Sequence, residues 1–197
     1  MESKGAMDYK PEDIFTPQGR LADVERQPNL DLLMNLFNIP RAFGVSGFGG
    51  NWNVGMHSFA AAMIAFMWAN FNGFSAEERD HLVTLALVHD LHEAATGDIL
   101  PMFKTPDVRQ RLDMLQRHML DALGIQADAA LAVDLKVIDL IAFLYEITQV
   151  SPSILHEKKL ALARAIADKQ RAILLSYARD NAIEEERINR FLALLGV

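Results

Sequence analysis

Residues 83–98, which read VTLALVHDLHEAATGD, decide how the rest of the chain is interpreted. The first part, Val83–Val88, is apolar except for one threonine and leads directly into His89 and Asp90. An apolar run of this kind, followed by a stop at Gly97, predicts a helix packed in the protein core. A histidine and an aspartate at the end of such a helix need partners there, because an unpaired buried charge is costly.

Helical patterns continue on both sides of this stretch. Ser75 and Glu78 form a capping box, which predicts that the central helix begins at residue 75, and its apolar positions extend to residue 95. The other expected helices cover residues 29–39, 54–71, 107–123, 128–150, 153–180 and 183–195. Since no segment alternates apolar and polar residues as a strand does, the sequence predicts an all-α fold, a bundle of about six or seven helices.

One folded domain is expected over residues 29–197, because neither a linker nor an internal repeat divides this range. Residues 1–28 contain three prolines and little apolar periodicity, so they are predicted to form an N-terminal arm. Residues 1–6 are equally compatible with a leader ahead of a native start at Met7.

The composition argues against several classes of protein. The formal net charge is −7, so the chain lacks the basic surplus that binding to a nucleic acid polymer requires. The longest apolar run, residues 59–68, is half the roughly 20 residues that cross a bilayer, so no membrane contact is expected. We expect a cytoplasmic protein, in the host cytoplasm if the source is viral. Because the chain has no cysteine, a metal site here would use histidine, aspartate and glutamate.

Four polar residues interrupt otherwise apolar helices: His57, His89, Asp90 and Asp139. Each has an ordinary explanation when it is considered alone, since a core histidine is often hydrogen-bonded and Asp139 can pair with Lys136. Their joint occurrence in three separate helices instead favours a shared site. Two imidazoles and two carboxylates around one divalent cation would satisfy all four side chains.

Two further carboxylates follow the His-Asp pair. In a continuous helix Glu93 would lie one turn beyond Asp90 on the same face, and Asp98 follows Gly97 just past the helix end. A pair of carboxylates beside a metal-bound water suits hydrolysis, because one can activate the water and the other can protonate the leaving oxygen. His92 lies close in sequence but is expected to point away from the metal face.

The order His57, His89-Asp90, Asp139 resembles the HD-domain metal-dependent phosphohydrolases. Residues 89–98, with Lys104 six residues later, resemble the branch that contains the bacterial 5′-deoxynucleotidases. Residues 29–58 are also similar to phage-encoded dATP triphosphohydrolases, in which an arginine precedes a glycine-rich loop and an aromatic-x-Val-x-x-His-Ser motif. The resemblance implies a single-domain HD-fold helical bundle.

The resemblance also implies roles for individual residues. It assigns the metal ligands as His57, His89, Asp90 and Asp139. Glu93 and Asp98 would position or activate the attacking water and handle the leaving group. Arg41 and Lys104 would hold the substrate phosphate, although each is otherwise an ordinary solvated cation.

Two positions depart from the family pattern. Ala42 and then Phe43 follow Arg41, where the deoxynucleotidases carry a tryptophan after the arginine, so sugar selectivity is not implied. Met56 stands where a glutamate is common, so one polar contact to the first histidine is expected to be missing. We expect one tightly held divalent ion, Mn, Co, Mg, Zn or Ni, with any second ion bound loosely through Glu93, Asp98 and the substrate phosphate.

The resulting hypothesis is metal-dependent hydrolysis of the 5′ phosphate ester of a deoxynucleotide, with dATP cut to deoxyadenosine and triphosphate. One alternative is a 5′-deoxynucleotidase that releases phosphate from monophosphates. Alternatives from other classes are a catalytically silent HD module that binds a nucleotide and regulates a partner, and a purely structural helical protein. Phe43 and Trp52 are candidates to stack on the base, or else they pack their loop onto the core.

A homo-oligomer is expected by analogy with the family. Its interface would use apolar residues of the later helices, namely Phe143, Leu144, Tyr145, Phe191 and Leu195. Burial of the same residues in the core of one subunit explains them equally well.

Overall fold

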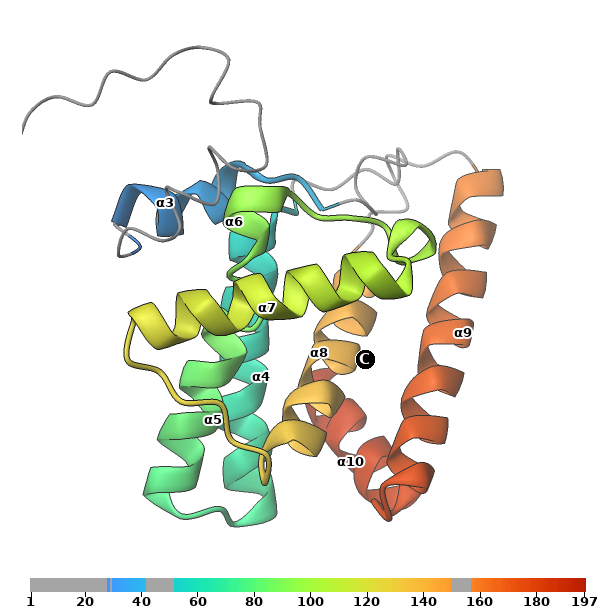
Figure 1. Cartoon of the computed structure of the whole chain (residues 1–197). Helices are drawn as coiled ribbons and strands as arrows, with labels where there is room; N and C mark the ends of the chain where they lie inside the picture. Colours follow the sequence, from blue (N-terminus) through green and yellow to red (C-terminus); the bar gives the residue numbers. More distant parts are fainter. Residues whose placement is uncertain (1–27, 29, 42–51, 150–156) are drawn as a thin grey trace, which may run out of the picture.

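The computed structural model describes residue 28 and residues 30–41, 52–149 and 157–197 (Figure 1). The predicted N-terminal arm, except for residue 28, and the glycine-rich segment 42–51 lie outside the described residues. The elements are α3 (Leu30–Met34), η1 (Asn35–Asn38), α4 (Val54–Asn72), α5 (Ala76–Val88), α6 (Glu93–Thr96), η3 (Pro101–Phe103), α7 (Pro106–Ala122), α8 (Ala132–Thr148), α9 (Glu157–Asp180) and α10 (Glu185–Leu195).

The predicted all-α fold is confirmed. Within the described ranges, the only strand-like pairing is an isolated antiparallel bridge between Pro40 and Asn53. Backbone hydrogen bonds on both sides of this bridge, from Arg41 N to Trp52 O (3.1 Å) and from Val54 N to Ile39 O (3.0 Å), fix the chain just before and after segment 42–51.

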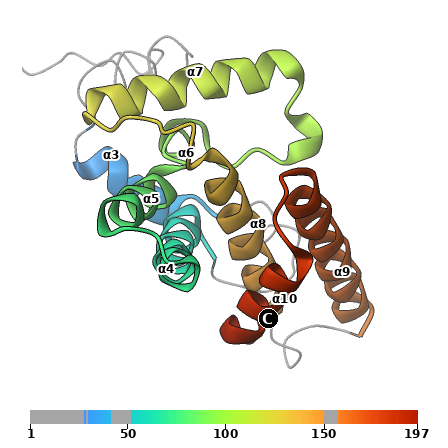
Figure 2. The same ribbon diagram turned by 90° about the horizontal axis from the view of Figure 1, so that it is seen from below.

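Helices α4, α5 and α8 form the centre of the bundle, α9 and α10 pack on its α8 side, and α7 lies crosswise over it (Figures 1 and 2). Trp68 of α4 is almost fully buried and packs edge-to-face against Phe191 of α10, with ring centroids 5.0 Å apart. Its indole nitrogen donates a 2.7 Å hydrogen bond to Asp134 of α8. This large side chain therefore joins three helices that are distant in sequence.

The prediction of one continuous helix from residue 75 to residue 95 is wrong. Helix α5 ends at Val88, and residues 89–92 form turns before the short helix α6. His89 explains the break, because its Nδ1 lies 2.7 Å from the carbonyl oxygen of Ala86, which would accept the Asp90 N–H in a continuing helix. Leu91 N instead bonds to Val88 O (3.1 Å), which tightens the chain into a turn.

Helix α8 begins four residues later than the sequence pattern suggests. The Asp128 side chain accepts a 2.8 Å hydrogen bond from Ala130 N and so favours a turn there instead of a helix start. Within α8 and α10, Leu144 and Phe191 belong to the buried core, and Phe143, Tyr145 and Leu195 are partly buried. Packing in one subunit therefore accounts for the residues considered for an interface, and self-association stays a prediction.

Helix α4 is long and apolar enough to cross a membrane by length and composition, which the count of residues 59–68 alone did not indicate. In this structure 56% of its apolar window is buried inside the bundle. That burial is typical of the core helix of a folded domain. The outward face of α4 carries Met56, Phe59, Met63 and Phe66.

Candidate active site

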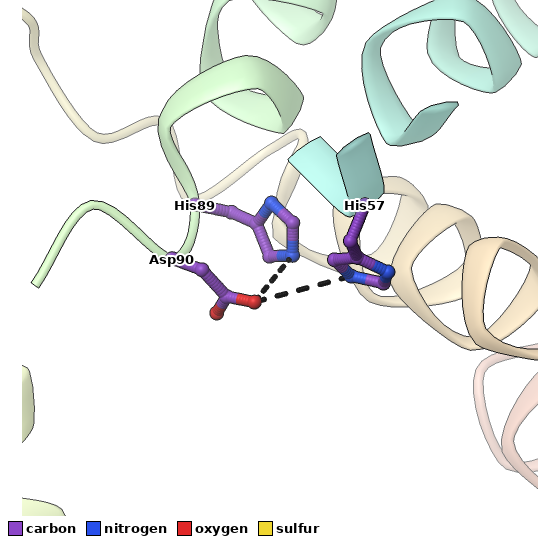
Figure 3. A group of neighbouring side chains, drawn as sticks. All are labelled: His57, His89 and Asp90. Carbon is purple, nitrogen blue, oxygen red and sulfur yellow. Dashed lines mark ion pairs between the residues drawn. The ribbon is translucent and has the colours of Figure 1, made fainter. Parts of the chain in front are cut away.

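The four predicted metal ligands converge at one place, although α4, the end of α5 and α8 supply them. Figure 3 shows three of them, His57, His89 and Asp90. One ligand atom each of His57, His89 and Asp90 lies within 4.8 Å of the others. Asp90 Oδ2 is 3.3 Å from His89 Nε2 and 3.9 Å from His57 Nε2. Asp139 Oδ1 lies 3.4 Å from His57 Nε2 and 3.7 Å from His89 Nε2. The two Nε2 atoms and the two aspartates thus face one another.

Local structure explains why these side chains meet. His57 lies in the first turn of α4, where the Asn53 side chain caps the helix by accepting a 2.8 Å hydrogen bond from Met56 N. The turn after α5 presents His89 and Asp90 side by side, and Asp139 lies in the middle of α8. Contacts of α4 with both α5 and α8 place the three elements together.

The chemistry of this donor set fits a divalent ion. His57 Nε2 and His89 Nε2 are buried and have no hydrogen-bond partner among the described residues. Two such nitrogens with two carboxylates match the preferences of borderline divalent ions such as Mn, Co or Zn. The residues present therefore suit the expected cofactor.

Asp139 makes both contacts that the sequence suggested for it, the ion pair with Lys136 and the approach to the two histidines. Its Oδ2 accepts a 2.7 Å hydrogen bond from Lys136 Nζ, while its Oδ1 faces the two histidines. Burial alone would raise the pKa of Asp139, but His57, His89 and Lys136 hold that pKa well below its ordinary range. The lysine pair therefore leaves the other oxygen available for the shared site.

The His89 and Asp90 pair has opposed pKa shifts. Burial would lower the pKa of His89, but Asp90 and Asp139 together raise that pKa well above its ordinary value. Burial would likewise raise the pKa of Asp90, but the neighbouring His89 lowers it. The two aspartates are therefore negatively charged at neutral pH, and a proton on His89 or a metal ion between the ligands would add to the positive charge that Lys136 and Arg41 supply.

Glu93 lies beside this site at the start of α6 and is 2% exposed. Its Oε2 lies 3.9 Å from Arg41 Nη1 and its Oε1 lies 3.8 Å from Lys104 Nζ. Burial, followed by Asp90 and Asp98, raises the pKa of Glu93 to about 9 despite these two cations. Glu93 therefore keeps a proton at neutral pH in the metal-free protein.

Arg41 connects the carboxylates at the site. Its Nη1 lies 3.6 Å from Asp90, 3.6 Å from Asp98 and 3.9 Å from Glu93. Burial would lower the pKa of Arg41, but Glu146 and the three other carboxylates raise it. Arg41 and Lys104 thus both reach the predicted catalytic carboxylates, where they can contact a phosphate.

One buried residue at this site was missed by the sequence reasoning. Glu146 of α8 is 1% exposed, and its Oε2 lies 3.3 Å from His57 Nδ1 and 3.5 Å from Arg41 Nε. The sequence indicated only that the polar contact from position 56 is missing; it did not indicate that α8 supplies a carboxylate to this histidine. A signal was present: Glu146 is an acid in an apolar helix, two turns after Asp139 and thus on the same face.

Trp52 packs against α8 just before α4 begins. Its ring meets Tyr145 edge-to-face, with centroids 6.1 Å apart, and the side chain is half-buried. This contact agrees with the packing interpretation of Trp52, and stacking on a base stays a prediction. Phe43 lies outside the described residues.

The remaining histidines of the described chain point elsewhere. His92, as expected, faces away from the ligands and lies 3.1 Å from the Gln116 side chain of α7, and burial lowers its pKa. His81 contacts Asp128 and the Gln126 carbonyl, and His118 is exposed.

Comparisons with known proteins agree with this architecture. The family model of the HD domain matches residues 44–133. The HD phosphohydrolase DatZ of cyanophage S-2L, solved with dA and one catalytic Zn²⁺ ion, has a TM-score of 0.61 and 16% identity over 86% of this chain and 97% of its own. A structural-genomics crystal structure has a TM-score of 0.52 and 22% identity over 77% of this chain and 95% of its own. At these identities the likeness shows the fold alone. No curated protein matches the sequence.

Proposed function

We propose that this chain, which contains an HD domain over residues 44–133, is a metal-dependent phosphohydrolase that acts on deoxynucleotides. The observation that carries the proposal is the convergence of two histidines and two aspartates from three helices, with an arginine, a lysine and two further carboxylates around them. A purely structural protein has no need to bury so many ionisable groups together.

Different residues of the chain bind the phosphate and hold the metal ion in the proposed reaction. Arg41 offers a planar group for two phosphate oxygens, and Lys104 offers a single point charge nearby. A divalent ion held by the two histidines and two aspartates would polarise the phosphoryl group and activate a water for attack on phosphorus. The new bond joins the water oxygen to the 5′ phosphorus, and the bond to the 5′ oxygen breaks.

Glu93 and Asp98 suit different steps of this reaction. Burial together with Asp90 and Asp98 raises the pKa of the Glu93 carboxyl, which favours the protonated form that a donor to the departing 5′ oxygen requires. Asp98 lies nearer to solvent, 3.6 Å from Arg41, where it can orient the attacking water beside the bound phosphate. We therefore assign Glu93 as the proton donor and Asp98 as the residue that positions the water.

The preferred substrate is dATP, cut to deoxyadenosine and triphosphate. The segment around Arg41 and residues 52–58, which is similar to phage triphosphohydrolases, supports this choice, as does the fold shared with a phage protein solved with dA. A 5′-deoxynucleotidase is the second candidate, because hydrolysis of a monophosphate breaks the same bond and would use the same residues.

Product analysis separates these candidates. The purified protein with Mn²⁺ or Co²⁺ is incubated with each deoxy- and ribonucleoside mono- and triphosphate, and phosphate, pyrophosphate and triphosphate are resolved. We expect triphosphate from dATP. Phosphate from monophosphates would identify a nucleotidase, and a protein that binds metal but forms no product would be a silent binding module.

Three variants test the assignment of residues. His89→Ala is expected to lose metal and activity together, and Glu93→Ala is expected to keep the metal and lose activity. His118→Ala, which changes an exposed histidine away from the site, is the matched control and is expected to keep both. Full turnover in Glu93→Ala would refute its role as proton donor.

A further inference from the structure

Glu146 is the one buried carboxylate of the described site to which the proposed reaction gives no role. It lies on α8, seven residues after Asp139, so two turns of one helix carry a predicted metal ligand and this acid. Both of its carboxylate oxygens are buried and make no hydrogen bond within the described chain. A buried carboxylate of this kind is costly unless it compensates a cation or orients a polar partner.

Two side chains face Glu146, and they belong to different parts of the site. Its Oε2 lies 3.3 Å from Nδ1 of His57, the ring nitrogen on the side away from Asp90 and Asp139. The same oxygen lies 3.5 Å from Nε of Arg41, which directs its Nη1 toward the catalytic carboxylates. A single oxygen therefore contacts both a predicted metal ligand and a predicted phosphate-binding group.

We propose that Glu146 is a positioning residue that orients His57 toward the metal and Arg41 toward the substrate phosphate. This inference rests on the proposed function. An imidazole that binds a metal through Nε2 carries its proton on Nδ1, and a carboxylate next to Nδ1 fixes this tautomer and the ring orientation. On the other side, the Glu146 charge holds the Arg41 guanidinium by its inner nitrogen, Nε, and keeps Nη1 beside Asp90, Asp98 and Glu93, where the phosphate would bind.

The test replaces the carboxylate by an amide of the same size. Glu146→Gln is compared with Asp134→Asn, which makes the same chemical change on the same helix at a half-buried acid that accepts a hydrogen bond from Trp68. The Mn²⁺ affinity of each purified protein is measured by titration without nucleotide, together with its melting temperature. We expect a roughly 10- to 100-fold weaker Mn²⁺ affinity in Glu146→Gln and a change below about twofold in Asp134→Asn.

Two further readouts separate positioning from a general loss of structure. In the zinc-loaded protein, nitrogen NMR is expected to show the His57 proton on Nδ1, and this signal is expected to weaken in Glu146→Gln. Inhibition by inorganic phosphate is expected to weaken in the same variant and to stay unchanged in Asp134→Asn. If Glu146→Gln does not fold, Glu146→Asp, which keeps the charge but withdraws it from His57, is expected to bind Mn²⁺ about tenfold more weakly.

The outcomes distinguish the two proposals. A wild-type protein that binds Mn²⁺, with unchanged Mn²⁺ affinity in the folded Glu146 variant, would overturn the positioning role and leave the proposed function standing. Equal losses in the Glu146 and Asp134 variants would also overturn that role. A wild-type protein that binds no divalent metal would overturn the proposed function and this inference together.

Discussion

The buried carboxyl of Glu93 lowers the stability of the fold at neutral pH, and a single substitution can measure by how much. Its pKa of about 9 in the metal-free protein means that the folded state keeps a proton that the unfolded chain releases above its ordinary value of 4.5. Folding is therefore disfavoured progressively as the pH rises through this window. The side chain lowers the stability of the fold because burial next to Asp90 and Asp98 disfavours its charged form.

Glu93→Gln is expected to stabilise the metal-free protein while abolishing turnover. Glutamine does not titrate, so its advantage in free energy of unfolding should be smallest near pH 4.5, grow with pH, and reach at least ~1 kcal/mol at pH 7. Urea denaturation of both proteins with a chelator at several pH values measures this difference. A constant difference across the range would show that Glu93 titrates normally.

Lys104→Ala is expected to raise the KM for dATP by roughly 10- to 100-fold, because it removes one charged contact with the phosphates. The kcat should change less under the proposed role, in which Lys104 binds the phosphates alike in the ground state and in the transition state. Steady-state kinetics measures both constants. Lys169→Ala, which changes an exposed lysine on α9, is the control. A fall in kcat at constant KM would instead place Lys104 among the groups that stabilise the transition state.

At the residue scale, polar side chains in apolar helices were sufficient to predict the shared position of His57, His89, Asp90 and Asp139. Glu146 was missed although it has the same signal. The reason is physical: its partners, His57 and Arg41, come from segments some 90 to 105 residues earlier, and sequence spacing within α8 does not show what faces it. Roles for Arg41 and Lys104 rested on family resemblance, since a charged side chain alone does not indicate a phosphate.

At the element scale, the turn between α5 and α6 depends on a side chain from a third helix. Gln116 of α7 donates a 2.7 Å hydrogen bond from Nε2 to Val88 O and accepts one of 2.9 Å from His92 N at Oε1. These bonds replace helical ones on both sides of His89 and Asp90. The crosswise helix α7 therefore fixes the backbone of the His-Asp turn.

Gln116→Leu is expected to lower the free energy of unfolding by about 2 kcal/mol, because it removes the acceptor of the His92 N–H and one of the two hydrogen bonds to Val88 O. Mn²⁺ affinity should fall as well, since the turn carries two of the ligands. Gln110→Leu, an exposed position on the same helix, is the control and is expected to change neither quantity. Unchanged urea denaturation in Gln116→Leu would show that water replaces the side chain.

Helix positions were largely predictable, and the helix ends were less so. Apolar periodicity located α4, α7 and α10 to within two residues, and the capping box located the start of α5. The end of α5 was not predictable from the pattern, because apolar spacing continues through residue 95. Two contacts interrupt the helix: the hydrogen bond from the His89 ring to the Ala86 carbonyl, and the bonds from Gln116 of α7. Neither contact has a sequence periodicity.

At the scale of the whole molecule, the metal ligands join α4, α8 and the turn after α5, so metal binding should stabilise the entire bundle. At a Mn²⁺ concentration of about 100 times Kd, the expected gain is about 2.7 kcal/mol. The shift in melting temperature with Mn²⁺, without Mn²⁺ and after chelation measures this gain in stability. His89→Ala is expected to show no Mn²⁺-dependent shift in melting temperature, and a shift equal to that of the wild-type protein would place the ion elsewhere.

The all-α class followed from the sequence, but the arrangement of helices did not. The ligands lie on α4, on α8 and in the turn after α5. The apolar periodicity of each helix does not indicate which helices are neighbours or at what angle they cross. Because the four predicted ligands need to be buried together, the segments that carry them were expected to lie close in space. The type of helical bundle was predicted from the resemblance to the HD-domain family. The crosswise position of α7 had no such signal in the sequence.

The bridge between Pro40 and Asn53 has a consequence for how this chain can evolve. Hydrogen bonds on both sides of it hold Arg41 and the start of α4 at fixed positions, whatever lies between them. Residues 42–51 can therefore change in length or composition while the catalytic groups keep their places. Exchange of this segment would leave Arg41 and the start of α4 in place, so related chains can differ here and keep the same arrangement of predicted ligands.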